Sequence, residues 1–146
     1  MEKHLMKALI SATLLSLLSA LANAATLELP SSMWVNRVNG EAVPSYRSTL
    51  SLENGLQILE LRYAELLKPN AEDHEFVSSE PLYLSFRASE DQVYRLKLPD
   101  LRSDAEVRQF ARQPTISLRS DTGAVEHTLL TQSQLMAVLA RSSLTF

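Results

Sequence analysis

The chain has 146 residues, no cysteine and a formal net charge of −3 at pH 7. The absence of cysteine excludes disulfide bonds, a thiol nucleophile, thiolate metal sites and the lipid anchor of a lipoprotein. The mildly acidic balance argues against a nucleic-acid partner, because binding to phosphates selects a basic surface.

The N-terminus has the pattern of a secretory signal peptide over residues 1–24. A short basic region precedes an uncharged apolar stretch over residues 9–21, and Ala22-Asn23-Ala24 supplies the small side chains that signal peptidase admits. The apolar stretch is shorter than the about 20 residues that span a bilayer, which argues against an uncleaved membrane anchor. We therefore expect cleavage between Ala24 and Ala25. Residues 25–146 are then expected to form a single β-rich, periplasmic or secreted domain without a transmembrane segment.

Short apolar runs between turn residues predict strands in the first half of the mature chain. Asn39-Gly40 and Asn54-Gly55 favour tight hairpin turns, because both positions tolerate a positive φ. Leu59 and Leu61 alternate with charged residues, which is typical of a half-buried strand, although residues 64–67 have the propensity to continue as a helix. The expected strands cover residues 26–29, 33–38, 41–43, 49–52 and 56–63.

Loop and strand patterns alternate in the region that follows. Residues 68–79 are polar and hold Pro69, which predicts an exposed, mobile loop. The alternating runs over residues 82–87 and 92–98 predict two strands that pair antiparallel with each other. Residues 115–118 and 125–130 are expected to form a last hairpin.

Two helices complete the predicted elements. Ser103 and Glu106 have the spacing of a capping box, in which the hydroxyl accepts from the N3 amide and the carboxylate accepts from the cap amide. This pattern predicts a helix over residues 103–112. Thr131 is expected to cap a short C-terminal helix that reaches Arg141.

The regular spacing of about seven short strands and their turns is typical of a mainly β fold. We therefore expect a small antiparallel β-sandwich of the immunoglobulin-like type. One helix is inserted between strands, and a short helix forms the C-terminal end.

Few residues point to catalysis or to metal binding. The sequence has no nucleophile and base at a recognisable spacing, no Gly-rich phosphate loop and no spaced set of metal ligands, so we expect neither enzyme activity nor a cofactor. Residues 72–75, which include His74, could bind a divalent cation, but adjacent side chains cannot all reach one ion, and a solvated loop is the favoured interpretation. Glu126 and His127 lie side by side on a predicted strand, where they point to opposite faces.

Two further sets of side chains are candidates for binding. Arg87, Arg95 and Lys97 are expected on the outer face of adjacent strands, where with Tyr83 they could hold an anion or a sugar, although an ordinary solvated face is favoured. The single tryptophan, Trp34, is either a stacking platform or, as we favour, a core anchor.

Several turn and strand patterns of the mature chain are distinctive enough to suggest a family. Thr26-Leu27-Glu28-Leu29, Val38-Asn39-Gly40-Glu41, the run from Leu52 to Ile58 and Tyr94-Arg95-Leu96-Lys97-Leu98-Pro99 resemble a family of exported Gram-negative proteins of unknown function. One branch of this family is named curli synthesis inhibitor. The resemblance implies a non-enzymatic binding protein that restrains the assembly of extracellular amyloid.

A β-rich inhibitor of this kind would use a strand at the edge of a sheet to bind a protein partner in the cell envelope, such as an amyloid subunit. The candidate edge is Thr26, Leu27, Glu28 and Leu29, or alternatively the final hairpin. The other interpretation that remains open is an accessory or structural module that binds glycan or another envelope protein.

Overall fold

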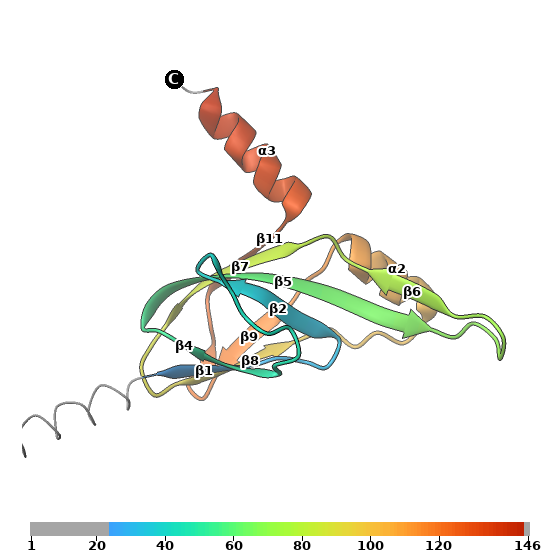
Figure 1. The fold of residues 1–146 in the computed structure, drawn as a ribbon, viewed down its shortest axis with the longest axis horizontal. Helices are drawn as coiled ribbons and strands as arrows, with labels where there is room; N and C mark the ends of the chain where they lie inside the picture. The colour runs from blue at the N-terminus through green and yellow to red at the C-terminus, as the bar shows by residue number, and fades with distance from the viewer. Residues whose placement is uncertain (1–23, 145–146) are drawn as a thin grey trace, which may run out of the picture.

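Two β-sheets form the framework of the computed structural model, which describes residues 24–144 (Figure 1). The predicted signal peptide lies outside the described residues except for Ala24, which is exposed. Ala25 is the first residue of strand β1 (Ala25–Glu28), so the predicted cleavage would leave this strand intact. The prediction of a mainly β sandwich with an inserted helix and a C-terminal helix is confirmed.

The first sheet has five strands, with β1 next to its centre. Strand β1 is antiparallel to β4 (Thr49–Leu52) on one side and parallel to β8 (Val93–Lys97) on the other. This parallel pair is a departure from the fully antiparallel sandwich that the sequence predicts. The order across the sheet is β10 (Gly123–Ala124), β9 (Ser117–Ser120), β8 (Val93–Lys97), β1 (Ala25–Glu28) and β4 (Thr49–Leu52).

The second sheet is built around the 13-residue strand β5 (Gly55–Leu67). This strand pairs with β2 (Met33–Val38) on one side and with β7 (Leu82–Ala88) on the other. A further short strand, β6 (Glu75–Ser78), pairs with the end of β5. The order across the sheet is β11 (His127–Thr131), β7 (Leu82–Ala88), β5 (Gly55–Leu67), β2 (Met33–Val38) and β3 (Glu41–Ala42).

Alternating side chains from both sheets meet in one apolar core. Leu59, Leu61 and Tyr63 occupy inward positions of β5 and are fully buried. The rings of Phe86 on β7 and Tyr94 on β8 lie 5.2 Å apart between centroids, so they join the two sheets across the core. Burial raises the pKa of the Tyr63 hydroxyl, and the charge of a nearby glutamate adds to this shift.

Helix α2 (Asp104–Arg112) begins at the predicted cap and packs against the core. The Ser103 hydroxyl accepts a hydrogen bond from the Glu106 amide at 3.1 Å, as predicted. The Glu106 carboxylate, however, accepts from the amide of Arg102, one residue before the cap. Phe110 holds the helix in place by an edge-to-face contact with Tyr63, with 4.7 Å between the ring centroids.

Helix α3 (Gln132–Ser143) follows β11 directly and projects from the sandwich (Figure 1). Thr131 caps it as predicted, and Gln134 completes a capping box with the Thr131 amide. None of its residues is buried. Its exposed apolar side chains include Met136, Val138 and Leu139.

The strand pairings predicted for neighbouring segments are partly wrong. The runs that form β7 and β8 do not pair with each other but lie in opposite sheets, because each turns its apolar side chains toward the core from its own side. The last hairpin is shorter than predicted. Strand β9 pairs with β10, whereas β11 crosses to the second sheet and pairs with β7.

Two local predictions also need correction. Residues 64–67 continue as strand β5 instead of turning into helix, since β6 supplies a neighbour for them; the segment expected to be a loop over residues 68–79 therefore contains a strand. Asn39-Gly40 forms the predicted tight turn, with φ values of 51° and 85°. Asn54-Gly55 instead lies where the chain passes from β4 in one sheet to β5 in the other.

Acidification is expected to weaken the attachment of α2 to β6. The Arg108 guanidinium donates to both carboxylate oxygens of Glu75, and this hydrogen bonding lowers the pKa of Glu75 below its usual value of 4.5. A lowered pKa in the folded state means that the pair stabilises the fold above about pH 4.5 and that this contribution is lost as the pH falls through the folded pKa. Since both side chains are partly exposed, the effect is small and decreases with salt.

Urea unfolding at pH 6 and pH 3 tests this dependence. The Glu75→Gln variant is expected to lose less stability than the wild type between the two pH values. Glu72→Gln, which removes an exposed carboxylate from the same region, is the matched control and should behave as the wild type does. If the stability of Glu75→Gln depended on pH as that of the wild type does, the Glu75–Arg108 pair would not be the source of this pH dependence.

Candidate functional site

The predicted binding edge is not an edge in the structure. Residues Thr26 to Glu28 of β1 pair with β4 on one side and with β8 on the other, so their backbone groups are engaged within the first sheet. Leu27 is fully buried, and Leu29 packs against the core directly after the strand. The prediction of this segment as an edge strand is wrong, because its partners come from distant parts of the chain.

The final hairpin, the alternative candidate for the binding edge, does supply edge strands. Its strands β10 and β11 each lie at the edge of a sheet. Strand β11 is the longer of the two and pairs only with β7 among the described residues. The Gln132 amide donates to the Pro81 carbonyl at 2.9 Å, so Gln132 is a residue whose backbone groups bond to the neighbouring chain. Every second residue of β11, counted back from Gln132, bonds to β7 in the same way. Because antiparallel pairs alternate, the N–H and C=O of Leu129 point away from β7, toward the open side of the sheet.

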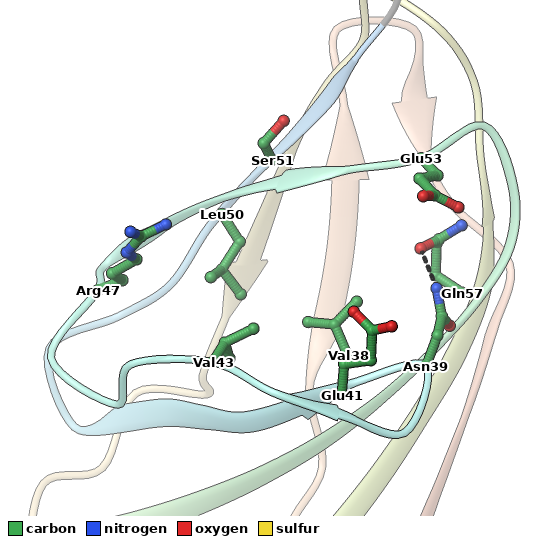
Figure 2. Close-up of a pocket in the computed structure, with 9 residues that line it drawn as sticks. All are labelled: Val38, Asn39, Glu41, Val43, Arg47, Leu50, Ser51, Glu53 and Gln57. Carbon is green, nitrogen blue, oxygen red and sulfur yellow. Dashed lines mark hydrogen bonds between the residues drawn. The ribbon is translucent and has the colours of Figure 1, made fainter.

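A pocket of about 290 Å³ lies between the two sheets at the edges opposite β10 and β11. The edge strands there, β3 and β4, do not pair with each other (Figure 2). Polar side chains surround an apolar wall in this pocket. Its lining residues are Val38, Asn39, Glu41, Val43, Arg47, Leu50, Ser51, Glu53 and Gln57.

A network of amide side chains organises the pocket. Gln57 occupies an inward position of β5 and is only 2% exposed. Asn39 donates to the Gln57 side-chain oxygen at 2.8 Å and accepts from the Ile58 backbone amide at 2.8 Å, so it ties the β2–β3 turn to β5 (Figure 2). The Gln57 amide nitrogen has two N–H groups and only one long contact, 3.4 Å to the Gly55 carbonyl, which leaves one donor available.

Replacing Asn39 by alanine is expected to lower the free energy of unfolding by about 2 kcal/mol. The change removes both hydrogen bonds of the side chain and places alanine at a φ of 51°. Chemical denaturation measures the loss. Asn39→Gly removes the same hydrogen bonds without backbone strain, so its free energy of unfolding should fall by about 1 kcal/mol less than that of Asn39→Ala. Equal stability of the two variants would contradict the expectation that alanine is strained at this φ.

The charged groups of the pocket carry no ion pair within the part of the chain that the structure describes. Glu41, Glu53 and Arg47 are exposed at its rim. The ion pairs of the described residues involve other side chains, among them Glu60 with Arg37 and Glu28 with Arg95. These three charges are therefore available to a ligand.

Trp34 is not the core anchor that the sequence favours. It lies on the outward face of β2, between the buried inward residues Met33 and Val35. Together with Tyr46, which is 84% exposed, it borders a second depression of about 320 Å³. The other lining residues of this depression are Pro30, Ser31, Met33, Ser45, Arg47 and Ser48.

The side chains of the candidate anion or sugar site do not lie together. Tyr83 and Arg87 lie on the second sheet, whereas Arg95 and Lys97 lie on the first, so they form no common surface. Arg95 instead pairs with acidic side chains on its own sheet, Glu28 and Asp121.

The two candidate histidines, His74 and His127, belong to no cluster of potential metal ligands in the described part of the chain. His127 contacts the Val125 carbonyl through its Nδ1 atom at 2.9 Å. The acidic segment 72–75 contributes Glu75 to the ion pair with Arg108, and Asp73 accepts from Asn70. Over residues 24–144 no group of three or more potential metal ligands lies close enough to hold an ion. The same part of the chain includes no helix with the length and apolarity needed to cross a bilayer.

Sequence reasoning missed the pocket around Gln57. The available signal was the polar residue at the first inward position of β5, in register with the apolar Leu59 and Leu61. Glu41 on the short strand β3 carries no such signal, and neither do Arg47 and Glu53, which lie in connections. The proximity of these three residues depends on how the two sheets pack.

Comparison with known proteins identifies relatives of unknown activity. A UPF0319 protein of Shewanella oneidensis is 31% identical over 124 residues, which cover 81% of this chain and 55% of the relative. A UPF0319 protein of Shewanella baltica is 32% identical over 122 residues, which cover 80% of this chain and 53% of the relative. The chain thus spans about half the length of these curated relatives. No match was found among solved structures.

A family model described as an uncharacterised protein conserved in bacteria, DUF2057, matches residues 26–143, from strand β1 to the end of helix α3. This match covers both sheets and the helices α2 and α3 of the described structure. The chain therefore belongs to the DUF2057 family of uncharacterised bacterial proteins.

Proposed function

We propose that this protein is exported and acts in the periplasm as a non-enzymatic binding protein that restrains amyloid assembly. Its site for the partner is the open edge of β11. The resemblance of the sequence to curli synthesis inhibitors suggests the partner, an extended segment of a curli-type amyloid subunit. The N-terminal pattern over residues 1–24 supports export.

The observation that carries the proposal is the orientation of Leu129. Its N–H and C=O groups point to the open side of the sheet, where no strand pairs with β11 in the described structure. An extended polypeptide can add to such an edge as a further strand, with its backbone bonds supplying the affinity. A subunit bound in this way is not available to template the next one, so growth of a cross-β fibre stops.

Helix α3 gives the partner a second contact beside the same edge. It starts at the end of β11 and exposes Met136, Val138 and Leu139, of which 60%, 47% and 54% is accessible. Apolar side chains exposed in this number on one short helix are typical of an interaction surface. A bound strand would therefore meet both backbone donors and apolar side chains.

An assay of polymerisation tests the proposal. Protein produced from the full chain and purified from the periplasm is added in substoichiometric amounts to a freshly desalted curli-type subunit, and fibre formation is followed by dye fluorescence. We expect a longer lag or a lower plateau, with no effect from an unrelated acidic β-sandwich. Unchanged kinetics at equimolar protein would contradict inhibition.

Export has its own test. The intact mass of the periplasmic protein should correspond to residues 25–146, because signal peptidase cuts after Ala24. A full-length mass, or retention of the protein in the cytoplasm, would contradict export.

A second candidate function is the binding of glycan at the depression between Trp34 and Tyr46. Partly exposed aromatic rings next to serine hydroxyls suit a sugar, whose C–H face stacks on the rings while its hydroxyls form hydrogen bonds. Trp34 is the only tryptophan, so its fluorescence reports on this site alone. Addition of envelope glycan fragments should shift the emission in the wild type but not in Tyr46→Ala; a silent tryptophan would count against this function.

A further inference from the structure

We infer that the pocket of Figure 2 binds a small molecule of the lysine class, with a carboxylate and a terminal ammonium group joined by an aliphatic chain. The inference goes beyond the proposed function and is independent of it. The pocket adjoins β3, which lies at the opposite edge of the second sheet from β11.

The floor of the pocket is a built polar site. The Gln57 side chain is 98% buried, and its oxygen is held by Asn39 at 2.8 Å. The free N–H of its amide lines the pocket without a partner among the described residues. The buried amide pair of Asn39 and Gln57 thus forms the polar floor of the pocket.

The charges of the pocket are separated by sign. Figure 2 shows Arg47 at one end of the pocket and Glu53, with the amide pair of Asn39 and Gln57, at the other. Glu41 projects into the pocket from the same half as Glu53 (Figure 2). The arrangement places a site for a carboxylate at the Arg47 end and a site for an ammonium group at the glutamate end.

An apolar wall lies between these two ends. Val38, Val43 and Leu50 line the middle of the pocket, and Leu50 is 4% exposed. Aliphatic methylenes can cover this wall while charged groups at both ends of the chain reach the rim, as lysine stems do on protein surfaces. A short apolar chain with opposite charges at its ends thus complements the pocket.

The net charge and the volume of the pocket further restrict the class of ligand. Two carboxylates and one guanidinium leave a net charge of −1 at the pocket, which favours a neutral zwitterion or a cation, such as 6-aminohexanoate or lysine, over an anion. The volume of about 290 Å³ is at the low end of small-molecule sites, which span roughly 300–1,000 Å³. Larger ligands are therefore disfavoured.

Titration of ¹⁵N-labelled protein, followed by NMR of backbone and side-chain amides, tests the inference. The protein is produced from the full chain, and its N-terminus is established by mass spectrometry. We expect L-lysine and 6-aminohexanoate to cause saturable shifts of the Asn39 and Gln57 side-chain amides, with dissociation constants of about 1 mM or lower. Norleucine lacks the terminal ammonium and hexylamine lacks the carboxylate, so each should bind at least about fivefold more weakly.

Matched variants separate the pocket from general charge effects. Glu53→Gln and Arg47→Gln should each weaken lysine binding at least about fivefold. Glu126→Gln and Arg119→Gln make the same changes at exposed residues outside the pocket and should leave the affinity unchanged. Absence of saturable shifts with lysine, or equal losses in pocket and control variants, would overturn the inference.

A tripeptide that ends in lysine distinguishes two sources of the same chemistry. Affinity equal to that of free lysine, lost in the C-terminal amide of the peptide, identifies the end of a polypeptide as the ligand. Weaker binding of the peptide identifies the free amino acid. The inference holds in both cases, because each ligand presents one carboxylate and one terminal ammonium.

Discussion

Replacing Leu27 by alanine is expected to lower the free energy of unfolding by about 3 kcal/mol. Leu27 is fully buried in β1, and its strand has neighbours on both sides, so the cavity left by the change cannot collapse easily. Urea denaturation of the purified variant gives the value. The result would distinguish a central strand from the binding edge that the sequence pattern suggests.

Leu56→Ala is the matched control for this prediction. Leu56 is 53% exposed on β5, and its removal should cost less than about 1 kcal/mol. If Leu27→Ala were as stable as Leu56→Ala, β1 would not lie between two strands, and the topology of the first sheet would need revision.

Replacing Phe110 by alanine is expected to cost about 3–4 kcal/mol. Phe110 is 5% exposed and attaches α2 to the second sheet by its edge-to-face contact with Tyr63, so the variant loses both buried area and the specific ring contact. Differential scanning calorimetry should show a lower Tm. Hydrogen exchange should show faster exchange over residues 104–112 than over β5.

The control for Phe110 is another phenylalanine in a different environment. Phe76 on β6 is 74% exposed, and Phe76→Ala should change the stability by less than about 1 kcal/mol. A loss in Phe76→Ala as large as that in Phe110→Ala would contradict the attachment of α2 through Phe110.

Local patterns of the sequence predicted local structure well. The Ser103 cap, the Thr131 cap and the Asn39-Gly40 turn depend on residues within a few positions of one another, and all three are present. The same reasoning was wrong for Asn54-Gly55, where an identical dipeptide connects the two sheets. Turn chemistry permits a reversal of the chain, but it does not choose the sheet in which the next strand lies.

Pairing between distant segments could not be predicted in the same way. Strand β1 has an edge-like sequence, short and with Glu28 at its end, yet β4 and β8 approach it from positions more than 20 residues away. The extension of β5 depends on β6, a four-residue strand that lies at the end of an otherwise polar segment. Outward placement of Trp34 likewise follows from the register of β2 against β5, which fixes Met33 and Val35 as the inward residues.

The open edge of β11 is the feature that the proposed function requires. Proline at position 129 removes the N–H that points to the open side of the sheet, whereas the bonds between β11 and β7 involve the neighbouring residues. Leu129→Ala keeps this N–H and is the matched control for loss of the side chain. Both variants should remain folded by circular dichroism.

The most direct measurement is the effect of Leu129→Pro on the polymerisation of a curli-type subunit. The account predicts that the wild type and Leu129→Ala lengthen the lag at substoichiometric ratios, while folded Leu129→Pro leaves the kinetics as they are without added protein. Full inhibition by folded Leu129→Pro would contradict the claim that β11 binds the partner as an added strand.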